Sequence, residues 1–332
     1  MKRLQLFLPS ITLTPEITLA DRATQFDLLA RVLGRATQHS DPTPTEALLC
    51  DAFGCTAPLG VAALTARIDL DDEINHAELL RADPVHLHVD PNKVLLFGPA
   101  QLDLTAAEAD AFLEVLRAEF PLLGWRRAAA SPTRWYIRRP ADVWAAAPSA
   151  AWLHGRSISP FFPTAITERA WRRLLNDVQM VLHEHPLNQT RTARGLPAVN
   201  GVWVFGGGPI CPAVATPITH TVGNDVLLLG LAAAHGVRSQ RNNTPAAALA
   251  ASGEVVVVAG PAFGRAAEES AAITLAAINS DWLPAILWAL RVGRIRQLDV
   301  VTHGHRSVLR GFGAWRPTSA RASFTFDDGD VT

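Results

Sequence analysis

The sequence predicts an α/β protein with a largely buried sheet and a smaller α+β lobe. Its 332 residues are 48% apolar and 18% charged, which suits one large folded domain or two unequal ones. Short apolar runs alternate with longer amphipathic patterns, except between residues 61 and 165, where a hairpin, a helix and a strand follow one another. We therefore expect a core formed by residues 1–60 and 166–332 and an inserted lobe formed by residues 61–165.

The predicted core strands are continuous apolar runs, which are typical of central strands covered on both faces. These runs are Leu4–Leu8, Val199–Phe205, Val226–Leu229 and Val255–Val258. The C-terminal part alternates apolar and polar residues instead, which predicts antiparallel strands. These segments are Ile295–Val301, Val308–Phe312 and Ala322–Phe326.

The lobe carries signals for each of its elements. Val85–Val89 and Val94–Phe97 flank a turn and predict a hairpin. Thr105 and Glu108 form a capping box, because each side chain can bond the other residue's amide at a helix start. An apolar helix face follows, and Arg134–Arg138 then predicts a further strand.

Three further helices are predicted in the core. The first follows Thr167 as a cap and ends before Pro186. The other two are Ala266–Ile278 and Trp282–Val292, the latter with Pro284 in its first turn, where a missing N–H costs little.

Charge and cysteine content exclude several classes of protein. Lys+Arg is 30 and Asp+Glu is 31, so the chain lacks the basic excess of a general nucleic-acid or membrane-surface binder. No run approaches the ~20 apolar residues of a membrane-spanning helix. Three cysteines without a C-x-x-C spacing predict no disulfide framework and a reducing, cytoplasmic location.

Two histidine pairs are candidate metal ligands. His86 and His88 are two residues apart on a predicted strand, as are His303 and His305, so each pair shares a face. Two imidazoles on one face can supply part of a zinc site. The alternative is that these are ordinary histidines on a sheet surface, and no acidic or cysteine partner stands at a recognisable spacing.

A polar connector at residues 185–200 joins a predicted core helix to a core strand. Its arginines suit carboxylate or phosphate, and the glycines after the strand can present amides to an anion. The candidate ligand-binding residues are Asn188, Arg191, Arg194, Asn200, Gly206, Gly207 and Gly208. The alternative is that these groups cap the helix and tie the two parts of the chain together.

The same segment carries a family resemblance. The stretch Trp171–Asn188, then Arg191, then Gly195–Gly208, resembles the RpfE-type bacterial regulatory proteins. More distantly it is similar to the archaeal-type cofactor-independent phosphoglycerate mutases. The resemblance implies an alkaline-phosphatase-like core with an inserted domain. It also implies phosphoryl transfer by a Ser or Thr nucleophile beside two divalent metals, such as Mn or Zn.

The sequence departs from that family where the metals would be held. Pro9-Ser10 stands in place of the family's Asp-Gly, Leu49 in place of a histidine, and Ala259 where a late metal ligand is expected. Thr45 is the candidate nucleophile, but a threonine hydroxyl without a metal cage is weak.

These departures favour a non-catalytic regulatory or partner-binding protein that has lost its two-metal site and needs no cofactor. Its expected partner is an unidentified protein or a small anionic metabolite, so a metabolite sensor is a second interpretation. The alternative is an active metal-dependent mutase or phosphatase with a rearranged site. Its candidate residues are Thr45, Asp51, Asp83, His86, His303 and His305.

Overall fold

The computed structural model describes residues 3–12, 27–55, 60–70, 78–139, 147–162, 169–209, 215–241, 244–259, 276–311 and 325–326. The chain forms two compact units. The first unit comprises residues 1–56, 212–262 and 268–328, and the second is mainly residues 57–211.

The first unit contains a mixed sheet in the order β10-β9-β11-β1-β12-β13-β2, with β14 paired to β1. The strands β10, β9, β11, β1 and β12 run parallel, whereas β13, β2 and β14 join antiparallel. Their bounds are β1 (Arg3–Thr12), β2 (Thr37–Ser40), β9 (Ile218–Val222), β10 (Arg238–Gln240), β11 (Glu254–Val258), β12 (Gln297–His303), β13 (His305–Arg310) and β14 (Thr325–Phe326).

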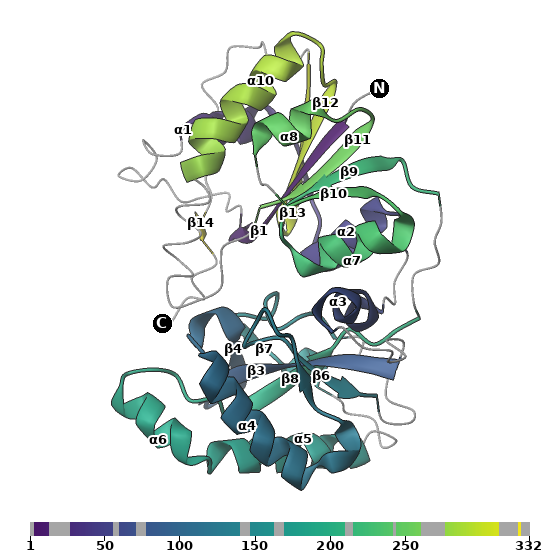
Figure 1. Ribbon diagram of the computed structural model, residues 1–332. Coiled ribbons are helices and arrows are strands. Elements are labelled where there is room, and N and C mark those ends of the chain that lie inside the picture. The colour runs from purple at the N-terminus through teal and green to yellow at the C-terminus, as the bar shows by residue number, and fades with distance from the viewer. Residues whose placement is uncertain are drawn as a thin grey trace. The chain divides into compact units, whose positions relative to one another are not determined.

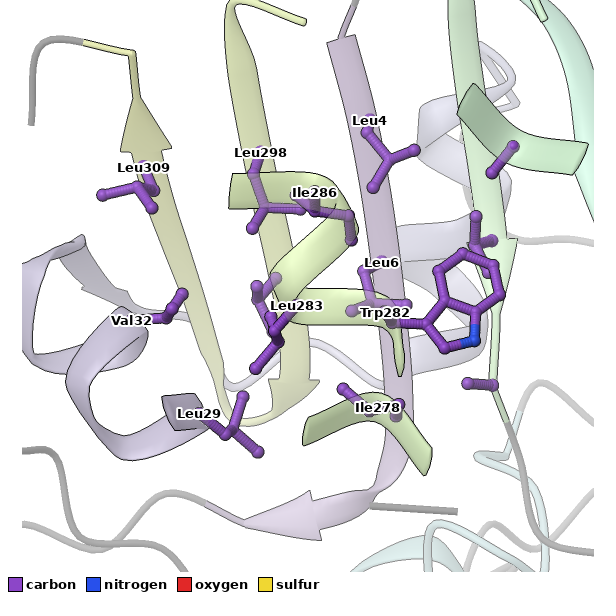
Figure 2. Packing of buried hydrophobic residues seen from close by; sticks show 14 of the residues in the cluster. Leu4, Leu6, Leu29, Val32, Ile278, Trp282, Leu283, Ile286, Leu298 and Leu309 are labelled. Carbon is purple, nitrogen blue, oxygen red and sulfur yellow. The ribbon is translucent and has the colours of Figure 1, made fainter. Parts of the chain in front are cut away.

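Helices cover both faces of this sheet (Figure 1). On one side lie α1 (Asp27–Arg35), α8 (Pro245–Ala250), a π-helix (Ile278–Trp282) and α10 (Leu283–Arg291), and on the other α2 (Thr45–Ala52) and α7 (Val226–His235). Figure 2 shows Leu4 and Leu6 of β1 packed against Trp282 and Ile286. Because parallel strands bury both faces, β1 and β11 read as continuous apolar runs.

The second unit contains an antiparallel sheet in the order β5-β6-β3-β4-β7, with β8 paired to β3. Its strands are β3 (Leu79–Asp90), β4 (Lys93–Phe97), β5 (Arg126–Arg127), β6 (Trp135–Arg138), β7 (Arg156–Ser157) and β8 (Gly201–Phe205). The predicted hairpin is confirmed, since His86 of β3 pairs with Phe97 of β4.

The helices of the second unit are α3 (Val61–Asp69), α4 (Ala106–Glu119), α5 (Arg169–His183) and α6 (Pro186–Ala193), with 3-10 turns at Pro99–Gln101, Pro121–Leu123 and Ser159–Phe161. The capping box of Thr105 and Glu108 is confirmed at the start of α4. Phe112 of α4 and Val178 of α5 join the apolar cluster under the sheet, together with Val204 of β8.

The second unit extends beyond the lobe that the sequence predicted. The prediction placed residues 166–210 in the core, whereas α5, α6 and β8 belong to the second unit. The reason is pairing: Val204 of β8 lies opposite Ala82 of β3. An apolar strand looks the same in sequence whichever sheet receives it.

One predicted strand is wrong. Val226–Leu229 is the start of helix α7, whose N-cap Asp225 accepts a hydrogen bond from the Leu228 amide at 2.9 Å. A short buried apolar run has no periodicity that separates a strand from a fully buried helix. The predicted cap Thr167 and most of the predicted helix 266–278 lie outside the described residues.

None of the described helices has the length and apolar character needed to cross a bilayer. Cys50 is free and buried. Cys55 is disulfide-bonded, which the cysteine spacing did not predict.

Candidate functional site

An open pocket of about 630 Å³ in the second unit is a candidate site among the described residues. We call it the arginine pocket, because three of its lining side chains are arginines. Its lining residues are Asp69, Leu70, Arg117, Pro121, Gly124, Trp125, Arg126, Arg127 and Ala129. They come from the end of α3, the end of α4, the 3-10 turn that follows and strand β5.

Local folding fixes the shape of this pocket. The turn at Pro121–Leu123 ends in Gly124, which has a left-handed backbone with φ of 54°. Glycine adopts that conformation without the steric cost that a Cβ would bring. Arg117, in the last turn of α4, donates from Nε to the carbonyl of Trp125 at 3.1 Å. The turn is therefore held to the end of the helix.

Arg127 is neutralised by a neighbouring carboxylate. Its Nε and Nη2 both bond Asp110, each at 2.8 Å, and its Nη1 bonds the Ala128 carbonyl at 2.9 Å. These hydrogen bonds and the positive charge lower the pKa of Asp110. A bidentate pair of this kind fixes the guanidinium plane.

The acidic residue of the described pocket lining is likewise paired. Asp69 accepts hydrogen bonds from Arg134 at 2.7 Å to each oxygen and from the Tyr136 hydroxyl at 2.6 Å. The Asp69 side chain is 2% exposed. The other charged groups of the described lining are Arg117, Arg126 and Arg127, of which Arg117 also acts on Asp110 and helps to lower its pKa.

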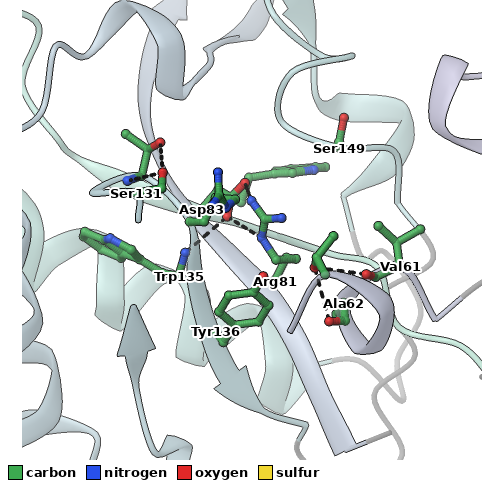
Figure 3. A network of polar contacts seen from close by, with 12 residues as sticks. Val61, Ala62, Arg81, Asp83, Ser131, Trp135, Tyr136 and Ser149 are labelled. Carbon is green, nitrogen blue, oxygen red and sulfur yellow. Dashed lines mark hydrogen bonds and ion pairs between the residues drawn. The ribbon is translucent and has the colours of Figure 1, made fainter. Parts of the chain in front are cut away.

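The second unit also contains a buried ion pair on strand β3. Arg81 binds Asp83 through Nε at 2.9 Å and Nη2 at 2.6 Å, and Asp83 also accepts from the Trp135 amide at 3.4 Å (Figure 3). The Arg81 guanidinium lies 5.3 Å from the ring centres of both Tyr136 and Phe205. Burial raises the pKa of Asp83, against the opposing effect of Arg81. Because the two charged groups are buried and bond each other, we interpret this pair as structural and not as part of a binding site.

Two predicted ligand-binding residues of the connector are used by the fold. Asn188 donates from Nδ2 to the carbonyls of Leu182 and Val199, at 2.7 and 2.9 Å, and its Oδ1 accepts from the Val199 amide at 2.8 Å. Arg191 is 0% exposed and bonds the carbonyls of Pro197 and Leu102.

Glu108 joins this connector to the start of α4. It lies 3.1 Å from Arg191 and 3.7 Å from the more exposed Arg194. Burial alone would raise the pKa of Glu108, but the Thr105 hydrogen bonds and the Arg191 charge outweigh it and lower the pKa. The sequence missed α6 in this connector, because Pro186 reads as the end of α5 but serves as the first residue of α6.

The Asn200 side chain makes the two backbone hydrogen bonds that a residue of a neighbouring strand would make. Its Oδ1 accepts from the Leu87 amide at 2.7 Å, and its Nδ2 donates to the Leu87 carbonyl at 2.9 Å.

The three glycines that follow β8 are buried against the start of helix α3. The Ala62 amide donates to the Gly206 carbonyl, and the Gly60 amide to the Pro209 carbonyl, both at 3.0 Å. This turn therefore presents carbonyls to a helix N-terminus, which is the reverse of an anion cradle.

The remaining candidates are divided between the units. Thr45, Asp51, His303 and His305 belong to the first unit, and Asp83 and His86 to the second. Thr45 is the buried first residue of α2, and Asp51 is exposed. Burial raises the pKa of the nearby Cys50 to about 12, so its thiol stays protonated at neutral pH.

The histidines show the arrangement of a sheet surface. His86 donates from Nδ1 to the Ala198 carbonyl at 2.9 Å, burial lowers its pKa, and its ring centre is 6.5 Å from that of His88. His305 is half-buried beside the turn at Gly304, and the side chain of His303 is not among those described. Within the described residues, no three His, Cys, Asp or Glu side chains are grouped to hold a metal.

Sequence reasoning did not find the arginine pocket. A signal was present in Trp125-Arg126-Arg127, two adjacent arginines after a tryptophan. Nothing in the sequence places Arg117, ten or so residues earlier, beside them, because the intervening turn decides their separation.

Comparisons with known proteins show distant structural likeness only. No protein-family model matches the chain, and no curated protein matches it. The PH0037 protein from Pyrococcus horikoshii superposes with a TM-score of 0.48 at 12% identity, over 97% of this chain and 90% of that one. The cofactor-independent phosphoglycerate mutase from Thermoplasma acidophilum superposes with a TM-score of 0.38 at 13% identity, over 92% and 88%. Likeness at this level of identity concerns the fold alone.

Proposed function

We propose that this chain is a non-catalytic regulatory protein that binds an anionic group in the arginine pocket. The observation that carries the proposal is the arginine content of the lining: Arg117 and Arg126 line the pocket beside Arg127, which Asp110 neutralises, and the lining carboxylate Asp69 is paired with Arg134. Guanidinium groups present a planar set of donors that matches carboxylate and phosphate oxygens. The volume of about 630 Å³ lies in the range of small-molecule sites.

The chemistry of the lining favours binding over catalysis at this site. Its nine described residues include no hydroxyl, thiol or imidazole that could act as a nucleophile or general base. Asp69, the carboxylate among them, is held by three hydrogen bonds. The described lining is therefore equipped to hold and orient an anion rather than to transform it.

The proposed ancestry is an alkaline-phosphatase-like, RpfE-type scaffold without its metal ligands. Support comes from the sequence, where Pro9, Leu49 and Ala259 stand at positions that would supply them. We also propose a cytoplasmic location, on the basis of the cysteine spacing. The disulfide-bonded Cys55 is an observation against that location.

Calorimetric titration with pyrophosphate and with citrate tests the proposed site. Arg126 lies in the exposed first position of β5, and a circular dichroism melt of Arg126→Gln checks that the variant keeps its fold. A hydrogen bond to a charged group contributes about 1.5–3 kcal/mol, so we expect Arg126→Gln to weaken anion binding roughly tenfold or more. We also expect binding to weaken with added salt.

The matched control is Arg194→Gln, since Arg194 is an exposed arginine of the same unit outside the pocket. Equal loss in both variants, or loss in Arg194→Gln alone, would assign anion binding to the connector and contradict the proposed site. Manganese-dependent hydrolysis of a phosphate ester that disappears in Thr45→Ala would instead establish the alternative, an active phosphoryl-transfer enzyme.

A further inference from the structure

The turn that ends helix α2 places a disulfide-bonded cysteine inside the first unit. Cys55 follows this turn and is 2% exposed. Its amide donates to the Cys50 carbonyl at 3.0 Å, and Gly54 before it has a left-handed backbone with φ of 82°. Glycine adopts that conformation without the steric cost of a Cβ, so the turn fixes where the Cys55 sulfur lies.

A histidine lies beside the Cys55 sulfur. Nε2 of His235, the last residue of α7, is 3.8 Å from Cys55 Sγ, and α7 lies next to α2 on one face of the sheet (Figure 1). The imidazole donates from Nδ1 to the Leu231 carbonyl at 2.9 Å, and the Phe53 ring packs against it with the ring centres 5.4 Å apart. These contacts hold Nε2 toward the sulfur, so the nitrogen that gains or loses the second proton is the one that faces the disulfide.

This geometry suits the breaking of a disulfide. A disulfide opens when a thiolate attacks one sulfur and the other sulfur leaves, and the reaction is faster when the leaving thiolate is stabilised. An imidazolium beside a cysteine sulfur provides that stabilisation, and histidine exchanges its proton close to neutral pH. In reducing compartments, the disulfides that do occur are mostly transient bonds with a catalytic or redox-sensing role.

The neighbouring thiol does not open the bond. Cys50 is buried and free, and burial raises its pKa to about 12, so the thiol stays protonated at neutral pH. The thiolate and not the thiol is the nucleophile in disulfide exchange. Opening the Cys55 disulfide at neutral pH therefore calls for a reductant from outside the chain.

We propose that the disulfide of Cys55 is a redox-sensitive bond that a dithiol reductant opens, with Cys55 as the leaving sulfur and His235 as its proton donor. One thiolate of the reductant attacks the sulfur bonded to Cys55, and the electron pair of the disulfide bond goes to the Cys55 sulfur, which takes the Nε2 proton. The second thiol of the reductant then attacks the mixed disulfide and frees the other protein sulfur. Two electrons and, by way of solvent and His235, two protons pass to the protein, and the dithiol becomes a disulfide. This inference is independent of anion binding in the arginine pocket.

Reduction of the oxidised full chain by dithiothreitol tests the inference. Samples are quenched with N-ethylmaleimide, and intact mass and peptide mapping follow the Cys55 thiol with time. His235→Asn retains a donor for the Leu231 carbonyl and removes the atom that faces Cys55 Sγ. We expect reduction to be about tenfold slower in this variant, or slower still, because a positioned acid contributes about a hundredfold or more in many enzymes. The matched control is His39→Asn on strand β2, an exposed histidine of the same unit, which should be reduced at the wild-type rate.

A second measurement separates proton donation from a structural role of His235. In the reduced wild type, iodoacetamide at pH 7 should label Cys55 faster than the buried Cys50, and His235→Asn should slow the labelling of Cys55. Circular dichroism melts of the oxidised proteins check that His235→Asn keeps its fold. A wild type that dithiothreitol reduces only after unfolding, or a folded His235→Asn that is reduced as fast as the wild type, would overturn the inference. Equal slowing in His39→Asn would do the same.

Discussion

At the scale of single residues, hydrogen-bond partners separate structural from binding side chains. Asn188 satisfies three backbone groups, and Arg191 is fully buried between two carbonyls and Glu108. Arg117 and Arg126 line the pocket, and Arg117 also bonds the Trp125 carbonyl. All four are polar residues near helices and strands, so residue type alone does not distinguish them. Their neighbours come from other segments, and only the folded chain shows which side chains the fold buries and which it leaves at a cavity.

The connector tests this distinction. Asn188→Ala should lower the free energy of unfolding by about 2–4 kcal/mol, because two carbonyls and one amide lose their buried partner. Arg194→Ala should change it by about 0.5 kcal/mol or less, as expected for an exposed side chain with a long ion pair. Urea denaturation of both variants measures the difference. Equal and small changes in the free energy of unfolding would mean that Asn188 does not stabilise the connector.

At the scale of elements, close backbone approach explains the glycine run after β8. Gly206 has φ of 77°, and a Cβ there would lie 2.9 Å from the Ala62 amide nitrogen. The sequence indicated a tight exit from the strand or a phosphate cradle, and the structure shows a strand exit that packs on α3. The helix start that meets it lies more than a hundred residues earlier in the chain, which is why spacing could not reveal the contact.

Two glycine variants separate backbone strain from steric overlap. Gly195 has φ of 70° with no atom near its absent Cβ, so Gly195→Ala should cost about 1–2 kcal/mol from the left-handed conformation alone. Gly206→Ala adds overlap with Ala62, so we expect about 2–4 kcal/mol in total. Thermal denaturation ranks the two. A smaller effect at Gly206 than at Gly195 would contradict the close packing of the turn on α3.

At the scale of the whole molecule, the chain divides into a discontinuous first unit and a nearly continuous second one. The second unit has its own sheet, its own apolar clusters and the arginine pocket within residues 57–211. A unit with a complete core of this size can fold alone.

We expect a fragment of residues 57–211 to unfold cooperatively. We also expect its affinity for pyrophosphate to lie within about threefold of that of the full chain, a difference in binding free energy of less than about 1.4 kcal/mol. Circular dichroism melts and calorimetric titration check this. A fragment ending at residue 165, the predicted lobe boundary, is the control. It lacks β8, the neighbour of β3, and should not unfold cooperatively. Equal behaviour of the two fragments would contradict the boundary drawn by the fold.

The sequence by itself determined the elements that rest on local signals. The hairpin of β3 and β4, the capping box of α4 and the buried strands β1 and β11 follow from turn residues, side-chain pairing within one turn and apolar runs. Tertiary structure alone decided that β8 joins β3, that Val226 begins a helix and that Arg117 lies near Arg126. These depend on contacts between segments far apart in the chain, and a local pattern carries no information about which distant group will satisfy a buried strand edge or a charge.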